Sequence, residues 1–484
     1  MMSRDGYEVV IGLEVHVQLA TESKIFSSDV NSFGGNPNEN ISAVTIAHPG
    51  TLPLINKKAV DYAIKMGLAL GCTINRELIF DRKNYFYPDL PKGYQITQDT
   101  TPICVGGGLE VVREDGQKKF IELTKIHLEE DAGKSMHVEG EDYTLVDLNR
   151  AGVPLIEIVT EPVLRTPEEA ALFLAEIRKI IRYLGISDGN MEEGSMRCDA
   201  NVSIRKAGEP LGSKVEVKNM NSIRNVTRAI LFEIERQTDL KQCGKTIFSE
   251  TRTFNPTRGD TTGMRTKEEL NDYRYFPEPD ISPLSIDEEW IRRLQAEMPE
   301  LPQQLKARFE NEYGLPAYDA GVLTEEKEIA DYFLDTIGHT TSYKAVSNWL
   351  MGPVKSYLNE KGISIQAFPL APARLADLLA LVQSGTVSHT AASQQLFGYL
   401  LEHPDESAEE SARKLNLVQE GNPDRILALV EEVLGQHPDK VKAYLNGKKA
   451  LTGMFMGEVM KKAGGTIDPK ETSRLIIETL ESKR

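Results

Sequence analysis

The first residues that could do chemistry lie on a single predicted strand. From residue 8 to residue 19, apolar side chains alternate with a second series that contains Glu14, His16 and Gln18. Because successive side chains of a strand point to opposite faces of a sheet, these three polar groups share one face. A half-solvated antiparallel sheet produces such a face without any function, and for a single strand that explanation is the more frequent one.

Three further segments predict polar strand faces of the same kind. They carry these acids, amides and bases: Glu157, Arg197, Asp199, Asn201, Glu216 and Lys218. Several strands with this composition favour a site that binds a hard cation together with anionic ligands. Carboxylate oxygens combined with one imidazole suit Mg²⁺ or Mn²⁺ better than zinc, which favours cysteine or several histidines.

Two other segments have unusual compositions. In HLEEDAGKS, residues 127–135, three successive acids run into a glycine and a lysine. The segment ends like a phosphate-binding P-loop, but that motif needs a glycine where Leu128 stands, so a P-loop NTPase is excluded. A solvated turn is the alternative for three acids in a row. In DRKNYFYPD, residues 81–89, Lys83 lies beside three aromatic residues, which could stack a base or simply pack together.

Helices and strands must alternate to position these residues. One-sided apolar spacing predicts a helix at 57–71, a capping box opens a second helix at Thr166, and a third runs from about residue 222 to 240. The fold class is therefore α+β, with an antiparallel sheet in a large domain at 1–295. Helical patterns then predict an all-α domain at 296–405 and a small helical tail domain at 406–484.

Composition excludes several classes of protein. The 484 residues are 40% hydrophobic and 27% charged, which is ordinary for a chain that folds in water. The sequence contains neither an apolar run long enough for a membrane helix nor a secretory leader. The four cysteines are widely spaced and fit neither a metal ribbon nor a disulfide framework, which indicates a reducing compartment.

Charge is distributed unevenly along the chain. The net charge is −17, yet residues 436–484 contain ten basic and six acidic residues, so the remainder carries −21. This asymmetry favours the tail as the part that would contact a polyanion, and a solvated helical surface is the alternative.

Six long segments carry a family resemblance. They are GLEVHVQL at 12–19, FDRKNYFYPDLPKGYQI at 80–96, HLEEDAGKS at 127–135, VDLNRAGVPLIEIVTEP at 146–162, MEEGSMRCDANVS at 191–203 and DYRYFPEPDI at 272–281. In this order they closely resemble the GatB/GatE family, the B subunits of the bacterial aspartyl/glutamyl-tRNA(Asn/Gln) amidotransferases. Six such motifs together are far more specific than any of the short patterns above.

The resemblance implies a fold, a reaction and partners. The large domain would be cradle-like and would hold the kinase and transamidase site, and the tail would bind tRNA. ATP, with Mg²⁺, would phosphorylate the carboxylate of misacylated Glu-tRNA(Gln) or Asp-tRNA(Asn), and ammonia would then displace phosphate. A glutaminase A subunit and a small C subunit would complete a cytoplasmic heterotrimer, since the chain itself has no glutaminase signature.

The resemblance and the strand faces together assign roles to individual residues. The expected metal ligands are His16, Glu130 and Glu157. The expected catalytic residues, beside the metal or at the acceptor end, are Glu14, Glu129, Asp199 and Asn201. The expected ATP and phosphate contacts are Lys83, Arg197 and Lys218. The expected tRNA contacts are Lys448, Lys449, Lys461 and Lys462.

Two other functions are compatible with the sequence. A carboxylate-amine ligase acting on a free small substrate would keep the metal and ATP site and would need no basic tail. A non-catalytic subunit for RNA binding or assembly would have polar strand faces of purely structural origin. ATP hydrolysis separates these two functions from the amidotransferase. Hydrolysis that requires tRNA indicates the amidotransferase, hydrolysis without tRNA indicates the ligase, and no hydrolysis indicates the non-catalytic subunit.

Overall fold

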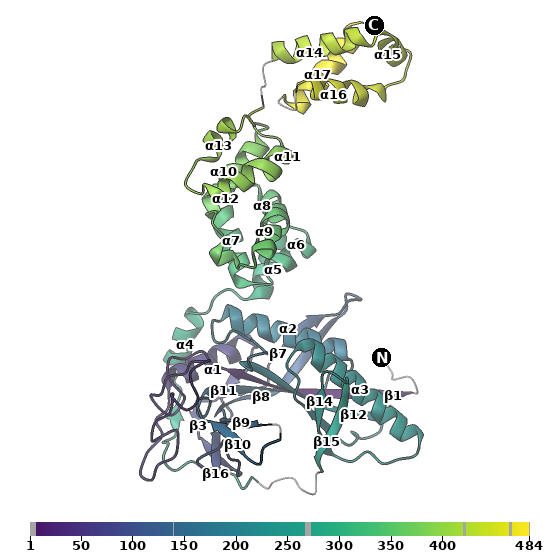
Figure 1. The fold of residues 1–484 in the computed structure, drawn as a ribbon. Helices are drawn as coiled ribbons and strands as arrows, with labels where there is room; N and C mark the ends of the chain where they lie inside the picture. Colours follow the sequence, from purple (N-terminus) through teal and green to yellow (C-terminus); the bar gives the residue numbers. More distant parts are fainter. Residues whose placement is uncertain (1–5, 139, 267–272, 420–422, 464–466, 484) are drawn as a thin grey trace. The chain divides into compact units, whose positions relative to one another are not determined.

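The chain folds into two compact units, Met1–Pro302 and Gln303–Arg484. The computed structural model describes residues 6–138, 140–266, 273–419, 423–463 and 467–483. The first unit holds the sheets and the second is helical (Figure 1), which confirms the predicted α+β class with helical C-terminal parts. The predicted boundary at residue 405 stays a prediction. Asp272, the first residue of the last motif, lies outside the described residues.

A sheet of ten described strands forms the framework of the first unit. Its order is β15-β14-β13-β12-β1-β11-β8-β6-β2, with β7 beside β8, and all its neighbours are antiparallel except β13 and β14. Its strands are β1 (Tyr7–Gln18), β2 (Thr73–Ile74), β6 (Cys104–Val105), β7 (Gly108–Val112), β8 (Lys118–Glu130), β11 (Pro154–Thr160), β12 (Met196–Lys206), β13 (Val215–Lys218), β14 (Glu250–Asn255) and β15 (Asp260–Thr266). The long central strands β1, β8 and β12 therefore come from distant parts of the sequence.

Helices cover one face of this sheet and leave the other for polar groups. Figure 1 shows α2 and α3 on one side and the hairpin of β9 (Lys134–His137) and β10 (Thr144–Asp147) on the other. The core lies on the helical side, where the apolar series of β1, including Ile11 and Val15, is fully buried. The helices of this unit are α1 (Lys57–Ala69), α2 (Pro167–Tyr183), α3 (Ile223–Gln242) and α4 (Glu288–Ala296).

Local signals in the sequence explain where these helices begin. Thr166 caps α2 by accepting a hydrogen bond from the Glu169 amide, and Ser222 caps α3 in the same way through Asn225. Gly185 follows α2 with φ +65, a conformation that glycine adopts without strain. These ends agree with the predicted helices to within about two residues, the usual uncertainty of helix limits.

An irregularity in β8 alters its alternation. The pairing of β8 with β11 aligns Lys125 with Val159 but Leu123 with Thr160, so Thr124 is an extra residue, a β-bulge. Leu123, before the bulge, is buried in the core, and so is Ile126, which comes after the bulge. The core-facing side chains therefore change from odd to even numbers within one strand.

Two smaller sheets complete the first unit. One contains β4 (Asp81–Asn84), β5 (Tyr94–Thr97) and β16 (Phe276–Pro277), and the other pairs β3 (Glu77–Leu78) with β17 (Leu284–Ser285). The end of β5 approaches β8, because the Gln95 amide donates to the Glu130 carbonyl oxygen at 2.7 Å.

The second unit consists of helices. They are α5 (Pro302–Asn311), α6 (Ala317–Leu323), α7 (Lys327–Ile337), α8 (Tyr343–Trp349), η2 (Leu350–Val354), α9 (Lys355–Lys361), η3 (Ile365–Ala367), α10 (Pro372–Gln383), α11 (His389–Ala391), η4 (Ala392–Leu396), α12 (Phe397–Glu402), α13 (Ala408–Lys414), α14 (Pro423–Gln436), α15 (Pro438–Leu445), α16 (Leu451–Lys462) and α17 (Pro469–Ser482). Helices α14 to α17 share a core of their own around Val430, Phe455 and Ile476. Among the described helices, none has the length and apolar character to cross a membrane.

Candidate catalytic site

The polar face of the large sheet gathers the charged residues of four neighbouring strands. The register places Glu157 of β11 opposite His16 of β1, and His127 of β8 opposite Glu157. On the other side of β1, Arg197 of β12 pairs with His16, and Asp199 pairs with Glu14. Because paired residues of adjacent strands lie on the same face, the side chains form a continuous polar surface. The predicted sharing of one face by these strands is therefore confirmed.

Two acids and two imidazoles form the first cluster on this face, hereafter the histidine cluster: His16, His127, Glu129 and Glu157. The Glu157 carboxylate lies 3.4 Å from His16 Nε2 and 3.2 Å from His127 Nε2. His127 Nε2 is also 3.4 Å from the Glu129 carboxylate. Ligand atoms of His16, Glu129 and Glu157 lie within 4.8 Å of one another, so a single cation could contact all three.

The protonation states of the histidine cluster depend on one another. Burial acts to raise the pKa of Glu157, but His127 and His16 lower it well below its usual value. Burial acts to lower the pKa of His127, yet Glu157 and Glu129 raise it to about 9. Without a bound cation, His127 is therefore an imidazolium between two carboxylates at neutral pH. A cation that enters would take over the neutralising role of this proton.

A second acidic group adjoins the first. Ligand atoms of Glu14, Asp199 and Glu216 also lie within 4.8 Å of one another. Lys218 Nζ neutralises two of them, at 2.5 Å from Asp199 and 2.9 Å from Glu216. Burial acts to lower the pKa of Lys218, but these two carboxylates raise it, so this amine stays charged. Asn201 Nδ2 donates to Glu14 at 2.8 Å, and its buried Oδ1 has no hydrogen-bond partner.

Glu14 differs from the other acids of the site. Burial, followed by the nearby charge of Glu157, raises the pKa of its carboxyl group. A carboxylate with a raised pKa accepts a proton more readily than an ordinary glutamate, which is the property a general base needs.

Arg197 is fixed by an acid that the sequence assignment omitted. Its Nη2 lies 2.6 Å from Asp131 Oδ2, and the same oxygen accepts a hydrogen bond from Gln18 at 2.8 Å. Arg150 Nε is 3.7 Å from this oxygen. The guanidinium of Arg197 is thus oriented on the polar face by a buried carboxylate that is shared with a second arginine.

Lys83 approaches the histidine cluster from β4. Its Nζ lies 4.9 Å from the centre of the Tyr273 ring. Burial acts to lower its pKa, but Glu129 and Glu157 contribute to raising it. The three predicted phosphate contacts, Lys83, Arg197 and Lys218, therefore lie around the two acidic groups.

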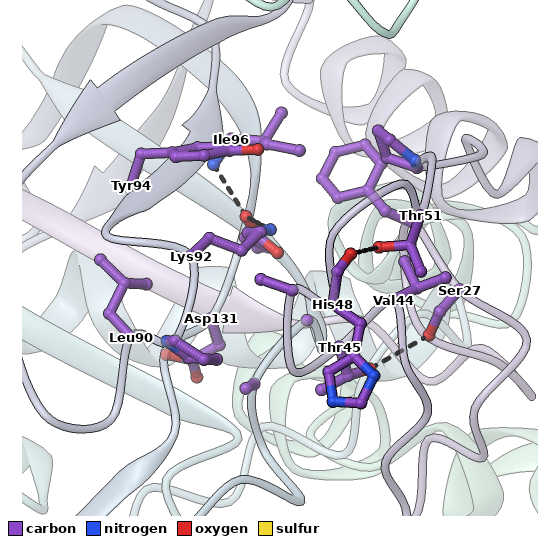
Figure 2. Close-up of a pocket in the computed structure, with 17 residues that line it drawn as sticks. Ser27, Val44, Thr45, His48, Thr51, Leu90, Lys92, Tyr94, Ile96 and Asp131 are labelled. Atoms are coloured by element: carbon purple, nitrogen blue, oxygen red, sulfur yellow. Dashed lines mark hydrogen bonds and ion pairs between the residues drawn. The ribbon is translucent and has the colours of Figure 1, made fainter.

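The structure does not bring Glu130 together with the other two predicted metal ligands, His16 and Glu157. Its carboxylate accepts a hydrogen bond from the Ile96 amide at 2.8 Å and is paired with Lys92. It lines a separate cavity of about 230 Å³ together with Lys92, Ile96 and His48 (Figure 2). Adjacent strand residues point to opposite faces, so Glu129, not Glu130, accompanies His16 and Glu157.

The four predicted tRNA contacts lie at the two ends of one helix. Lys448 and Lys449 are exposed just before α16, and Lys461 and Lys462 are exposed at its end. Lys449 Nζ lies 4.1 Å from the Tyr444 ring centre, and Lys462 pairs with Glu432 at 2.5 Å. Twelve helical residues span about 18 Å, which separates the two pairs by that distance.

The sequence-based assignment gave no individual role to three members of the site: His127, Asp131 and Glu216. His127 and Asp131 belong to the recognised motif HLEEDAGKS, and Glu216 lies on the same predicted face as Lys218. The period-2 rule, applied to the end of this motif, would have grouped His127 with Glu129. The partnership of Asp131 with Arg197 joins residues 66 positions apart, and no local pattern encodes it.

Comparison with known proteins covers both units. The family model described as GatB/GatE catalytic domain matches residues 9–292, and the model described as GatB domain matches residues 331–480. The aspartyl/glutamyl-tRNA(Asn/Gln) amidotransferase B subunit of Thermosynechococcus vestitus is 47% identical, with 98% of this chain and 96% of that protein aligned. The protein of the same name from Salinibacter ruber is 46% identical, with 100% and 99% aligned. The chain therefore belongs to the GatB/GatE family.

Proposed function

We propose that this protein is the subunit that converts misacylated Glu-tRNA(Gln) and Asp-tRNA(Asn) into Gln-tRNA(Gln) and Asn-tRNA(Asn). It would act as a carbon–nitrogen ligase, with ATP as co-substrate and glutamine as the amide donor of the assembled complex. The observation that carries this proposal is the polar face, on which two acidic groups lie beside three fixed cations. The names of the relatives, which cover nearly the whole chain, support the same reaction.

The histidine cluster fits a magnesium ion. His16, Glu129 and Glu157 offer two carboxylates and one imidazole within 4.8 Å, and hard cations prefer such oxygen-rich sets. A divalent cation at this position would neutralise charge on the triphosphate during phosphoryl transfer. Glu14, Asp199 and Asn201 would complete this site or hold a second ion and the acceptor end, and the unpartnered Asn201 Oδ1 is available for such a contact.

The cations of the polar face would hold the phosphates. Arg197 and Lys218 lie on one face of the large sheet and Lys83 comes from β4 of a smaller sheet, so an anion could meet cations from two sheets. Asp131 keeps Arg197 in its orientation before substrate arrives. Phosphoryl transfer depends mainly on such positioning and charge neutralisation, since the side chains need not form covalent intermediates.

Glu14 is our candidate for the proton acceptor of the second step. Attack of ammonia on the acyl phosphate forms the amide bond and breaks the bond to phosphate, and the nitrogen loses one proton, which the released phosphate finally carries. Glu14 lies beside Glu157 and accepts a hydrogen bond from Asn201, so its carboxylate is placed within the site where it could receive that proton. Ammonia would come from a glutaminase A subunit within a heterotrimer that also contains a small C subunit. The four free cysteines fit the reducing cytoplasm as the location.

Reconstitution tests the proposed function. The chain, combined with an amidase partner, ATP, Mg²⁺ and misacylated tRNA, should amidate Glu-tRNA(Gln) or Asp-tRNA(Asn) with either glutamine or ammonium as donor. The chain alone should not hydrolyse glutamine. ATP hydrolysis should require misacylated tRNA.

Each alternative function has its own outcome in the same assay. Hydrolysis of ATP that ignores tRNA would indicate a ligase for a free small substrate. Absence of hydrolysis with every partner present would indicate a subunit for assembly or RNA binding.

We further propose that α16 contacts the tRNA backbone. Replacement of Lys448, Lys449, Lys461 and Lys462 by glutamine should weaken tRNA binding about tenfold or more at physiological salt, because it removes the cations that would contact phosphates. Each lost phosphate contact should also lower the salt dependence of binding. In filter-binding measurements at salt concentrations of about 50 to 300 mM, the slope of log affinity against log salt concentration should be shallower for this variant.

A matched substitution tests whether position matters as well as charge. Lys470→Gln removes an exposed lysine from α17 and should change the affinity little. Equal affinity for the quadruple variant and the unaltered chain would contradict a role for α16.

A further inference from the structure

A large cavity adjoins the proposed phosphate site. It has a volume of about 680 Å³ and is lined by Arg197 and Asp199 on one side and by residues 31–35 on another. Cavities of roughly 300 to 1,000 Å³ are typical of sites for small molecules and cofactors. A phosphate held by Arg197 would therefore leave room for the remainder of a nucleotide.

Phe33 is the aromatic residue that lines this cavity. Its side chain is 76% exposed, and it is followed by Gly34 and Gly35, which also line the cavity. Exposure of a single apolar residue is common and needs no explanation. A phenylalanine ring that lines the same cavity as an arginine is a different case, because a base can stack on the ring while its phosphates pair with the guanidinium.

The chain that follows Phe33 is held in place by polar contacts. Asn38 Nδ2 donates to the Val146 carbonyl oxygen at 3.0 Å, and Asn149 Nδ2 donates to the Asn36 carbonyl oxygen at 2.7 Å. Lys24, which is fully buried, donates from Nζ to the carbonyl oxygen of Asn40 at 2.7 Å. The first two bonds connect residues 36 and 38 to residues 146–149, and the third connects residue 40 to residue 24, so the chain directly after Phe33 is anchored.

We propose that Phe33 stacks on the base of an adenosine moiety whose phosphates extend toward Arg197. This inference rests on the proposed function, in which both substrates contain adenosine: ATP carries one, and every tRNA acceptor end finishes with another. The cavity volume, the exposure of the ring and the presence of Arg197 in the same lining support the same ligand chemistry. Phe33 would contribute to affinity for the base and would not take part in the transfer of phosphate or ammonia.

The test compares ligands with and without the base in the assembled complex. In Phe33→Ala, the inhibition constant of ADP should rise about tenfold, the scale of one lost base–aromatic stack. Inhibition by inorganic tripolyphosphate, which lacks the base, should be unchanged. Phe33→Trp should restore ADP affinity, because an indole also offers a stacking face.

Two kinetic arms identify the source of the adenosine. A higher KM for ATP with an unchanged KM for misacylated tRNA would assign the stack to ATP, and the reverse would assign it to the acceptor end. Phe248→Ala, at a similarly exposed phenylalanine that does not line this cavity, should alter neither.

The negative outcomes are distinguishable. Unchanged KM values and inhibition constants in Phe33→Ala would overturn the role of Phe33 while the proposed function stands. Equal losses of ADP and tripolyphosphate affinity would also overturn it, because they would indicate a disturbed site rather than a lost stack. Failure of the unaltered complex to consume ATP would instead count against the proposed function.

Discussion

Replacement of His16 by alanine should lower the rate of ATP-dependent amidation by about 10²- to 10³-fold, the range found when one preorganised electrostatic group is removed from a catalytic site. His16 contributes the single imidazole of the proposed metal set, and the remaining acids, Glu129 and Glu157, would then hold the cation less well. The measurement is the initial rate of Gln-tRNA formation by the reconstituted complex at saturating ATP.

The Mg²⁺ concentration that ATP hydrolysis requires distinguishes a metal ligand from a residue with another role. Glu129→Gln should raise the Mg²⁺ concentration needed for half-maximal ATP hydrolysis, whereas Glu130→Gln should leave that concentration unchanged, because Glu130 faces Lys92 and Ile96. Glu235→Gln, at an exposed position of α3, is the control for loss of an acid. Undiminished activity of His16→Ala, with normal tRNA binding in all variants, would refute the metal site.

Stability in metal-free buffer should fall as the pH rises from about 6.5 to 9. The pKa of His127 is raised from 6.5 to about 9 in the folded chain, so its protonation stabilises the fold fully below 6.5. That contribution is lost as the pH rises through the folded value, at a cost of up to about 3 kcal/mol in the free energy of unfolding. Glu157 has the opposite dependence: its lowered pKa stabilises the fold above its usual value of 4.5 and is lost in acid.

Urea unfolding in EDTA, at pH values from about 5 to 9, can measure this loss in the free energy of unfolding. Trp290 belongs to the sheet unit and Trp349 to the helical unit, so Trp349→Phe leaves a fluorophore that reports on the sheet unit alone. His127→Gln should flatten the alkaline part of the profile. A steep alkaline loss that persists in this variant would show that another group titrates.

The sequence contained enough information for β1 and β12 because the alternation of these two central strands is uninterrupted. In β1 the apolar series from Val9 to Leu19 is buried, and Glu14 and His16 share the opposite face as expected. The caps Thr166 and Ser222 act through neighbouring residues, so their helices were also predictable. Both kinds of signal lie within a few residues of the structure that they determine.

The metal set was only partly predictable because of the bulge in β8. Alternation continued from Ile121 and Leu123 would place Glu129 on the core side and Glu130 on the polar side. The extra residue at Thr124 reverses this arrangement. Whether a strand carries a bulge depends on its partner, here β11, and a period read along one segment contains no information about the partner.

The parallel direction of β13 and β14 was equally impossible to predict from a local pattern. These two are the parallel pair in the described sheet, and α3 connects them. The alternation of Glu216 and Lys218 predicted a strand and a polar face, but no residue within it specifies the direction of its neighbour. Contacts between distant segments, such as Asp131 with Arg197, share this limitation.

The bulge at Thr124 also constrains how related chains can diverge in length. Loss of one residue between Leu123 and Ile126 would restore simple alternation and turn His127 and Glu129 toward the apolar side, while each amino acid of the motif remained unaltered. Gain of a second residue there would have the same effect. Natural selection should therefore reject insertions and deletions in this stretch more strictly than substitutions at Thr124 itself.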